Sequence, residues 1–326
     1  MVAVIILNWN GYEDTIECLK SLKNAMGDFF IIVVDNGSDN DSIFRLLDYL
    51  NSEIFGHHTI REGEELNHIP NNRECILYCL NENYGFAKGN NMAIQLLHEH
   101  MPEWCLLLNN DTTVTNDFLT KLTTFTLQHK DYKIVTPLIY YYYDKKIIWN
   151  AGGNILWGFR KYNYPDQTKE AIKEKYYIDC TFITGCALMF KSDLLSKDKK
   201  IFTELFFHGE EDFDLSIRMN KARVKMACVL DSIIYHKVNK STAHIKSLGK
   251  IYVHYLNRFI NIKRHFCFLN YKLWELISLC TVIRTLKRHG LRNHECLKFC
   301  IKLTKDSKKL ESIDKAKFFE LMQHYE

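Results

Sequence analysis

Long apolar runs alternate with helical patterns in the first third of the chain. Continuous apolar runs occur at 2–7, 29–34 and 105–108, and polar residues follow each of them. Between the runs, residues 14–23 and 42–50 repeat their apolar positions with helical spacing. Strands that are apolar throughout and are joined by helices are typical of a parallel sheet covered on both faces. The pattern therefore predicts an α/β fold.

A glycine-punctuated segment follows the next predicted strand. Residues 56–73 are polar, residues 75–80 have strand character, and residues 83–91 read NYGFAKGNN. We expect a helix from Met92 to about His100 after this segment. Glycines permit close backbone approach, and the free N–H groups at a helix start favour anions. The segment matches neither the P-loop nor the Rossmann glycine pattern, so on its own it is as compatible with a structural turn.

The pattern is less regular in the second half of the chain. Residues 134–164 are rich in Tyr, Trp and Gly and predict short strands and loops, and residues 178–190 predict a strand interrupted by a glycine. Residues 209–222 begin in carboxylates and continue as an amphipathic helix, which the predicted strand 225–236 follows. The remainder of the chain is helical and basic.

Polar side chains stand at the carboxyl ends of the predicted strands. They are Asn8 to Asn10, Asp35 to Ser38 and Asn109 to Asp111. In open α/β sheets, ligands bind in the crevice outside the carboxyl ends of the strands. Asp111 with Asp35 could hold a divalent cation and a diphosphate, because Mg²⁺ and Mn²⁺ take carboxylate oxygens and share their coordination with phosphates. Taken alone, Asp111 is equally suited to a turn or a helix cap.

A cluster of carboxylates forms the strongest local motif. Glu210, Glu211, Asp212 and Asp214 lie within GEEDFDL (209–215). Like charges this close repel unless they are solvated, share a cation or serve as a base. The alternative is an acidic helix N-terminus, which the helix dipole favours. His236 ends the last predicted strand, as a hydrogen-bonded histidine or as a metal ligand.

Composition indicates a folded protein without a membrane span. The chain has 326 residues, of which 47% are hydrophobic and only four are prolines, enough for one large domain or for one domain plus an appendage. The N-terminus lacks the features of a signal peptide, and no apolar stretch is long enough to cross a bilayer. Eleven scattered cysteines without a C-x-x-C pair favour reduced thiols. These features predict a cytoplasmic protein.

Charge is unevenly distributed along the chain. Residues 246–326 carry a net charge of +10, whereas the preceding residues carry −6. An acidic body with a basic tail indicates a tail that meets an anionic surface, and a solvated helical face is the alternative. No recognised nucleic-acid motif accompanies the basic tail, so we expect no nucleic-acid partner.

Taken together, segments of the chain resemble the family 2 glycosyltransferases with a GT-A fold, and most closely the bacterial rhamnosyltransferase-like branch that builds surface polysaccharides such as capsule and lipopolysaccharide. In order, the segments are VAVIILNWNGYEDTIECLKSL, IIVVDNGSDNDS, NENYGFAKGNN, LLLNNDTTV, FITGCALMF, FFHGEEDFDLSIRM and IIYHKVNKST. They cover about residues 2–245, and the tail matches only loosely, through YLNRFINIKR (255–264).

The resemblance implies a Rossmann-like, mostly parallel sheet flanked by helices. A catalytic domain would span residues 1–245, with a nucleotide-binding half at 1–115 and an acceptor-binding half at 116–245. Residues 246–326 would form a basic helical C-terminal extension.

The resemblance also implies roles for single residues. The nucleotide-sugar would contact Asn8, Trp9, Asn10, Asp35, Asn83, Gly85, Asn90, Asn109, Asn110 and Asp111. Asn109 to Asp111 occupies the D-x-D position with Asn in first place, and Asp111 and His236 would bind the metal. Asp212 would be the catalytic base with Glu211 beside it. The acceptor and sugar pocket would include Thr184, Gly185, Trp157 and Asp214.

The implied activity is an inverting glycosyl transfer that depends on Mg²⁺ or Mn²⁺. The donor would be a dTDP- or UDP-linked sugar, with rhamnose favoured by the branch likeness. The acceptor would be a saccharide hydroxyl, which a polyprenyl diphosphate can carry. One base without an enzyme nucleophile implies direct displacement at the anomeric carbon. The basic tail would then hold the enzyme at the inner face of the plasma membrane.

Two other functions remain open at this point. A sugar-nucleotidyltransferase also pairs a parallel sheet with a metal, but the glycine-rich triphosphate loop of such enzymes is absent after ILNWNGYED. A non-catalytic glycan- or nucleotide-binding protein would explain Asn109 at the D-x-D position. The Glu211–Asp212 pair argues against that second function.

Overall fold

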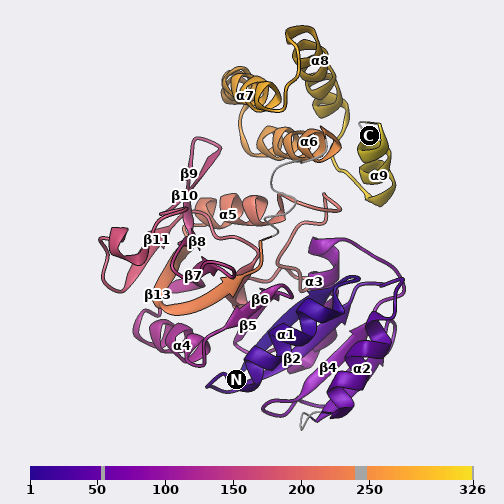
Figure 1. Cartoon of the computed structure of the whole chain (residues 1–326), viewed down its shortest axis with the longest axis vertical. Helices are drawn as coiled ribbons and strands as arrows, with labels where there is room; N and C mark the ends of the chain where they lie inside the picture. The colour runs from indigo at the N-terminus through magenta and orange to yellow at the C-terminus, as the bar shows by residue number, and fades with distance from the viewer. Residues whose placement is uncertain (53–55, 239–247, 325–326) are drawn as a thin grey trace.

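The computed structural model describes residues 1–52, 56–238 and 248–324, and its centre is a mixed β-sheet (Figure 1). The strands of this sheet are β1 (Val2–Asn8), β2 (Phe29–Asp35), β3 (His57–Arg61), β4 (Cys75–Cys79), β5 (Trp104–Asn109), β6 (Thr112–Val114), β7 (Tyr132–Tyr141), β8 (Ile148–Asn150), β11 (Tyr177–Cys180), β12 (Ala187–Lys191) and β13 (Lys225–His236). A separate hairpin consists of β9 (Gly153–Leu156) and β10 (Phe159–Tyr162).

Helices flank the sheet and form the C-terminal region. The α-helices are α1 (Tyr12–Lys23), α2 (Ser42–Ser52), α3 (Phe86–Leu97), α4 (Phe118–Gln128), α5 (Glu211–Lys221), α6 (Leu248–His265), α7 (Phe268–Arg288), α8 (Asn293–Lys309) and α9 (Lys315–Gln323). Short 3₁₀ turns lie at His98–His100, Lys169–Ala171 and Ser192–Leu194. This architecture confirms the predicted α/β fold with a C-terminal helical region.

The strand order places the polar strand ends along one edge. Among the described strands the order is β11-β13-β7-β12-β5-β1-β2-β4-β3, with β6 beside β13 and β8 beside β7. Strand β1 pairs in parallel with both β2 and β5, in registers that set Asn8 beside Asp35 and Leu7 beside Asn109. The carboxyl ends of three adjacent strands therefore meet, as the sequence pattern predicts.

Both faces of the sheet are covered, which explains why its strands are apolar throughout. Ala3 and Ile5 of β1 belong to a core that α3 shares, while Val4 and Ile6 belong to a core that α1, α2 and α4 share. Successive side chains of a strand point to opposite faces, so a strand with helices on both sides has no solvent-facing position.

Several elements differ from the sequence-based expectation. Helix α3 begins at Phe86 rather than Met92, so most of the glycine-punctuated segment is helical. Gly89 has a packing role inside that helix, because a Cβ there would lie 2.8 Å from the Leu7 side chain. The expected strand at 178–190 is two strands, β11 and β12, separated by residues 181–186.

The structure also contains elements that the sequence pattern did not indicate. Strand β3 lies within the polar stretch. It is an edge strand on which only Ile60 is buried, so most of its positions can be polar. Helix α4 was not predicted, and β7 is a ten-residue strand where only short strands were expected.

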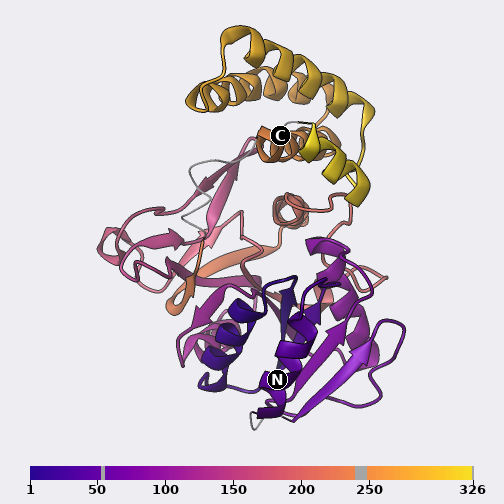
Figure 2. The same cartoon turned by 45° about the vertical axis from the view of Figure 1, so that its right-hand side comes forward.

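The C-terminal helices share a core with the preceding part of the chain. Helices α6 to α9 lie at the end of the molecule remote from the N-terminus (Figure 2). Phe182, Phe206 and Phe213 pack into one buried cluster with side chains of α6, α7 and α8. The backbone N–H of Phe207 also donates to the Ile313 carbonyl oxygen at 2.7 Å. The expected boundary at 245/246 falls outside the described residues.

None of the described helices has both the length and the apolar character that a membrane span requires.

Candidate active site

Asn8 and Asp35 are joined at the ends of β1 and β2. The Asn8 amide donates to Asp35 Oδ1 at 2.7 Å, and the Ser38 hydroxyl donates to the same oxygen at 2.6 Å. The Thr15 hydroxyl donates to Asn8 Oδ1 at 2.9 Å. Asn8 and Asp35 are fully buried. Their side chains therefore shape this edge of the sheet and lie beneath its surface.

Asn10 connects the two loops above Asp35. Its side chain donates to Asp39 Oδ1 at 2.5 Å and accepts the Asp39 backbone N–H at 3.0 Å. Asn10 has a φ of 53°, which its short polar side chain tolerates. The Trp9 side chain beside it is half exposed, so an aromatic surface is available at this edge.

Asn83 and Gly85 form the turn that starts α3. Asn83 Oδ1 accepts the Gly85 backbone N–H at 2.8 Å and the Asn36 amide at 3.0 Å. Gly85 has a φ of 82°, and a Cβ there would lie 2.1 Å from the Phe207 carbonyl oxygen, so no other residue fits. Asn90 lies inside α3, where its amide donates to the Phe86 carbonyl oxygen.

The end of β5 places Asp111 against His236. Asn110 donates to the Thr15 hydroxyl at 3.1 Å, which ties the loop to α1. Asp111 Oδ1 lies 3.1 Å from His236 Nε2, and the Trp149 ring packs edge-on against the imidazole at 4.5 Å. The structure brings these two candidate metal ligands together, although more than one hundred residues separate them in the sequence.

Asp111 and His236 have donor atoms that suit a divalent cation. His236 Nε2 is the nitrogen that faces Asp111 Oδ1, and the Cys186 side chain also contacts this imidazole. Burial lowers the pKa of His236, but the neighbouring Cys186 and Asp111 outweigh it and raise that pKa to about 10. A carboxylate and an imidazole fit Mn²⁺ or Mg²⁺, which fill the rest of their coordination with phosphates and water.

Asp212 lies in the first turn of α5. Its Oδ2 accepts the Gly185 backbone N–H at 3.2 Å, and its Oδ1 lies 3.9 Å from Arg160 Nη1. Burial raises the pKa of Asp212, Arg160 opposes this rise, and Glu210 adds to it. Burial and the Asp212 charge raise the pKa of Glu211 to about 8. Of Asp212 and Glu211, Asp212 is the better candidate for a carboxylate that accepts a proton, because Arg160 favours its charged form.

Residues 184–186 connect Asp212 to the Asp111–His236 pair. Gly185 donates its N–H to Asp212, while the Cys186 side chain contacts His236. The Cys186 carbonyl oxygen accepts the Asn109 backbone N–H at 2.8 Å. Thr184 is nearly buried, and its hydroxyl accepts the Cys186 N–H at 3.3 Å. One short segment therefore lies between the two groups of candidate residues.

Helix α6 holds the turn that precedes Asp212, which the sequence did not reveal. Glu210 has a left-handed φ of 76° and a buried carboxylate. Both nitrogens Nε and Nη2 of Arg258 donate to that carboxylate, the second at 2.7 Å. Asn261 donates to the Glu210 carbonyl oxygen and Asn257 to that of His208. The C-terminal region thus positions the turn that precedes Asp212.

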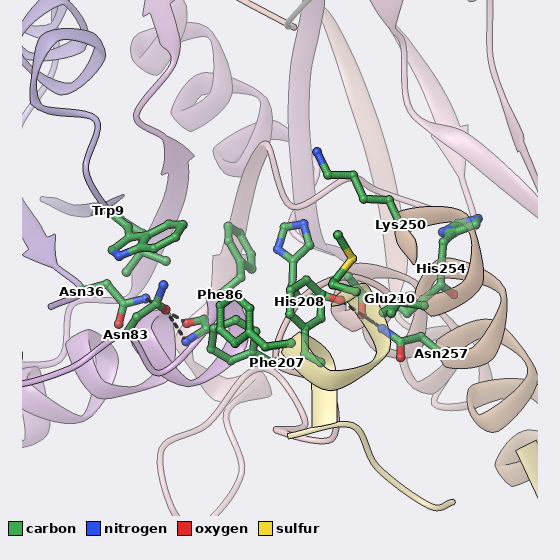
Figure 3. Close-up of a pocket in the computed structure, with 17 residues that line it drawn as sticks. Trp9, Asn36, Asn83, Phe86, Phe207, His208, Glu210, Lys250, His254 and Asn257 are labelled. Atoms are coloured by element: carbon green, nitrogen blue, oxygen red, sulfur yellow. Dashed lines mark hydrogen bonds and ion pairs between the residues drawn. The ribbon is translucent and has the colours of Figure 1, made fainter. Parts of the chain in front are cut away.

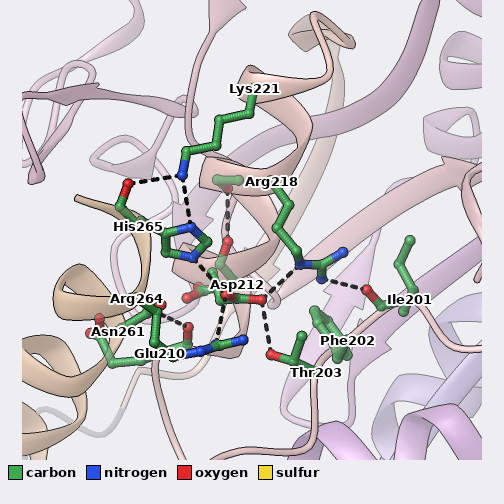
Figure 4. A network of polar contacts seen from close by, with 12 residues as sticks. Ile201, Phe202, Thr203, Glu210, Asp212, Arg218, Lys221, Asn261, Arg264 and His265 are labelled. Carbon is green, nitrogen blue, oxygen red and sulfur yellow. Dashed lines mark hydrogen bonds and ion pairs between the residues drawn. The ribbon is translucent and has the colours of Figure 1, made fainter. Parts of the chain in front are cut away.

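Asp214 does not lie in a sugar pocket, contrary to the sequence-based expectation. Its carboxylate is fully buried and is bound by Arg218 Nε and His265 Nε2, both at 2.8 Å (Figure 4). Thr203 also donates to it, and Arg264 lies 3.4 Å away. Although burial raises the pKa of Asp214, these partners lower it to about 2. A permanently charged, enclosed group of this kind links α5 to α6.

Trp157 lies in the turn between β9 and β10. Its ring centroid is 6.1 Å from that of Phe266, just after α6. The side chain remains 40% exposed. No contact described here joins it to the other candidate residues.

A cavity of about 560 Å³ lies between the N-terminal half and the C-terminal helices. Trp9, Asn36 and Asn83 stand on one side of it, and Lys250 and His254 stand on the other (Figure 3). The complete lining is Leu7, Trp9, Asn36, Asn83, Gly85, Phe86, Phe207, His208, Gly209, Glu210, Lys250, Val253, His254, Asn257, Phe318, Phe319 and Met322. Neither Asp111 nor Asp212 is among these residues, so the cavity adjoins the candidate catalytic residues through Glu210.

The mixed sheet, parallel through β5-β1-β2-β4-β3, and the helices that flank it form a GT-A-like glycosyltransferase fold. Residues 3–196, more than half of the chain, match the model of glycosyl transferase family 2. The protein belongs to this family.

Solved structures share the fold at low sequence identity. The mannosyltransferase PcManGT from Pyrobaculum calidifontis, in complex with GDP-Man and Mn²⁺, has a TM-score of 0.55 at 13% identity, covering 94% of this chain and 75% of that one. GalNAc-T7 with UDP, GalNAc and Mn²⁺ has a TM-score of 0.58 at 13% identity, covering 100% of this chain and 58% of that one. Staphylococcus aureus TarS has a TM-score of 0.49 at 16% identity.

The TarS match covers 82% of this chain and 40% of TarS, so the chain spans less than half of the length of TarS. No curated protein matches the chain.

Proposed function

We propose that the protein is an inverting, metal-dependent glycosyltransferase that moves a sugar from a nucleoside diphosphate to a hydroxyl group. The observation that carries the proposal is the link through residues 184–186. This segment contacts Asp212 on one side and His236 on the other. A base for the acceptor and a cation site for the leaving group belong close together in such a reaction.

Asp212 is the general base in this proposal. As the acceptor oxygen bonds to the anomeric carbon, the Asp212 carboxylate takes the hydroxyl proton. The bond between that carbon and the diphosphate oxygen breaks, and its electron pair leaves with the nucleoside diphosphate. Direct displacement inverts the anomeric centre. Arg160 favours the charged form of Asp212 before the proton is transferred.

Asp111 and His236 would hold the divalent cation. Mn²⁺ or Mg²⁺ at these residues would supply positive charge for the leaving diphosphate. The Asp111 carboxylate and the His236 Nε2 that faces it are the groups available for the cation. Asn109 in the first D-x-D position contributes its backbone to the sheet instead.

We assign the donor nucleotide to the edge formed by β1, β2 and the start of α3. The polar groups there are Asn8, Asn10, Asp35, Asn83 and Gly85, with the Trp9 ring beside them. A dTDP- or UDP-linked sugar fits the proposal, with rhamnose favoured by the branch likeness.

The acceptor in this proposal enters from the aromatic cavity beside Glu210. Phe207, Phe318 and Phe319 line it with apolar area, and Lys250 and His254 add nitrogen groups at the far side. Such walls suit a saccharide carried on a polyprenyl diphosphate at the inner face of the plasma membrane. The product would then be a growing surface glycan.

A nucleotide-sugar panel with Mn²⁺ or Mg²⁺ tests the proposal, with donor hydrolysis and transfer as readouts. We expect one donor to be turned over and Asp212→Asn to lower the rate by at least about 100-fold. Asp231→Asn, at an exposed ion pair with Lys169, is the matched control. Undiminished transfer by Asp212→Asn refutes the base assignment. Donor binding without turnover indicates the non-catalytic alternative, and pyrophosphate release indicates a nucleotidyltransferase.

A further inference from the structure

Helix α7 is apolar on both of its long faces. Tyr271, Trp274 and Val282 are buried against the rest of the molecule. The opposite face carries exposed apolar side chains, among them Leu273 at 54% and Leu276 at 65% exposure. An exposed apolar stripe on a helix normally marks a surface that another molecule or a membrane covers. The outer face of α7 therefore lacks a covering element within the described residues.

The exposed apolar side chains of α7 continue onto α8. Leu297 and Ile301 of α8 are 60% and 59% exposed, and they line a groove together with Leu279 of α7. We define the α7–α8 face by its exposed side chains, Phe268, Leu269, Leu273, Leu276, Ile277, Ile283, Leu297 and Ile301. This face lies on the helices at the end of the molecule remote from the N-terminus (Figure 2).

The same two helices carry a concentrated positive charge. Residues 268–309 contain ten Lys and Arg and three Asp and Glu, a net charge of +7. The three acids pair locally, Glu275 with Lys272, Glu295 with Arg292, and Asp306 with Lys302. Lys305, Lys308 and Lys309 border the groove.

Apolar and cationic groups on one face select the kind of surface that covers it. A second copy of the chain, docked face to face about a two-fold axis, would bring two such positive segments together. An anionic bilayer instead takes the apolar side chains between its acyl chains and the cations at its headgroups. An interfacial helix lies in the plane of the membrane, so it needs no spanning length.

We propose that the α7–α8 face docks the protein onto an anionic lipid bilayer. This inference rests on the proposed function in one respect, because it delivers the enzyme to a lipid-linked acceptor. In this arrangement the basic C-terminal helices lie with α7 and the groove beside α8 against the lipid. The catalytic sheet then faces away from the bilayer.

Vesicle co-sedimentation of the full chain tests the docking face without donor or acceptor. Vesicles of phosphatidylcholine with one-third phosphatidylglycerol should bind the protein, and phosphatidylcholine alone should bind it at least 10-fold more weakly. The triple variant Leu273→Ser, Leu276→Ser, Ile277→Ser should lose at least 10-fold in partitioning. The control is the triple variant Phe44→Ser, Ile69→Ser, Leu127→Ser, which changes equally exposed residues elsewhere.

Equal partitioning of the two triple variants overturns the docking face. So does a dimer in light scattering that the α7 triple variant dissociates, because the face then covers a second copy. Transfer to a soluble saccharide acceptor serves as a separate readout. Absence of this transfer in the unaltered protein counts against the proposed function, whereas vesicle binding tests the docking face alone.

A different cluster, at the opposite edge of the sheet, carries a second inference. His58 is the second residue of β3, and Glu74 directly precedes β4. His68 Nε2 lies 2.6 Å and His58 Nε2 lies 3.4 Å from the same oxygen, Glu74 Oε1. The other Glu74 oxygen accepts the Asn71 N–H at 2.8 Å. These strands are parallel to β2, so the cluster lies at the amino edge, remote from the candidate active site.

We propose that His58, His68 and Glu74 bind a zinc ion. Two imidazoles and one carboxylate are ordinary zinc ligands, and one ligand atom from each lies within 4.8 Å of the others. Glu74 is only 4% exposed, and its orientation is already held by Asn71. Bound zinc would fasten the loop between β3 and β4 to the edge strand, a structural role separate from catalysis.

Zinc titration of the chelator-treated full chain tests this site. The His236→Gln background removes the candidate cation ligand at the other edge. We expect one zinc per chain by calorimetry and a higher Tm with zinc. His68→Gln should weaken binding at least 10-fold, whereas His57→Gln, at the neighbouring position of β3, should not. No binding, or equal binding by His68→Gln, overturns the proposal.

Discussion

In the proposed mechanism, Asp212 has to be ionised to accept a proton, although it lies in a partly enclosed turn with Glu210 and Glu211. Burial and Glu210 raise its pKa, and Arg160, 3.9 Å away, opposes the rise. We therefore interpret Arg160 as the residue that keeps Asp212 in its basic form. The Arg160 guanidinium is itself held over the Phe182 ring.

Replacing Arg160 should move the pH dependence of the reaction. Without the Arg160 charge, the pKa of Asp212 rises further. As the solution is acidified, the activity of Arg160→Gln should therefore begin to fall at a higher pH than that of the unaltered protein. The measurement is kcat/KM against pH, with Lys169→Gln as the control at an exposed ion pair. An unchanged acidic limb in Arg160→Gln would contradict this role.

Glu211 should make the fold less stable as the pH rises. Its pKa lies near 8 in the folded chain, against 4.5 ordinarily, so the unfolded chain releases this proton first. The stability that this group contributes is complete below about pH 4.5 and is lost as the pH rises through about 8. Glu211→Gln removes the titration. Its Tm relative to the unaltered protein should therefore be higher at pH 9 than at pH 5, and a constant difference would refute this.

Residues with a distinct local sequence context were the ones that could be predicted. Asp111 follows an apolar strand and Asp212 stands in a carboxylate cluster, so both are visible in the sequence. Arg160 and Arg258 reach the site from a hairpin and from α6, and nothing near them in the sequence indicates a partner. Asp214 belongs to the same cluster as Asp212 but contacts Arg218 and His265. Residues two positions apart on a helix face different sides.

At the scale of elements, α6 supports the turn before α5 through the Glu210–Arg258 pair. Both side chains are nearly inaccessible, at 2% and 11% exposure. Removing one partner of a buried ion pair leaves the other charge without compensation.

Arg258→Met should therefore lower the free energy of unfolding by about 3 kcal/mol. Urea denaturation measures the loss, and the double variant with Glu210→Gln should recover part of it. Arg45→Met breaks an exposed pair with Asp41 and should change stability by less than about 1 kcal/mol. Equal effects of the two single variants would contradict a structural role for Arg258.

Element boundaries depend on packing that the sequence pattern does not express. Gly85 and Gly89 suggested a loop, but their missing side chains allow α3 to begin close to Phe207 and to pack on Leu7. The edge strand β3 has a single buried position and therefore no alternating pattern. The buried central strands, by contrast, were predicted because helices cover both of their faces.

At the scale of the molecule, the C-terminal helices and the catalytic part form one buried cluster. Phe182, Phe206 and Phe213 contribute to it from the catalytic side. The charge and the pattern of the sequence suggested an appended extension. They could not reveal the shared core, because contacts between distant segments leave no trace in local composition.

Removal of residues 248–326 should therefore abolish cooperative folding. Truncation would expose these three phenylalanines and leave Glu210 without Arg258. Calorimetry of the full chain should show a single thermal transition, and the truncated chain should aggregate or unfold without a sharp transition. A soluble truncated chain that melts cooperatively would show that the two parts are independent.

Strand β12 runs antiparallel between β5 and β7, so the chain enters it from the edge where the two acids lie. In the proposed mechanism, residues 184–186 therefore contact both the group that would remove the acceptor proton and the group that would hold the cation. An insertion or a bulkier side chain in those three positions would shift both at once. Attempts to redesign the enzyme for another donor or another acceptor should therefore leave this tripeptide intact and vary the flanking loops.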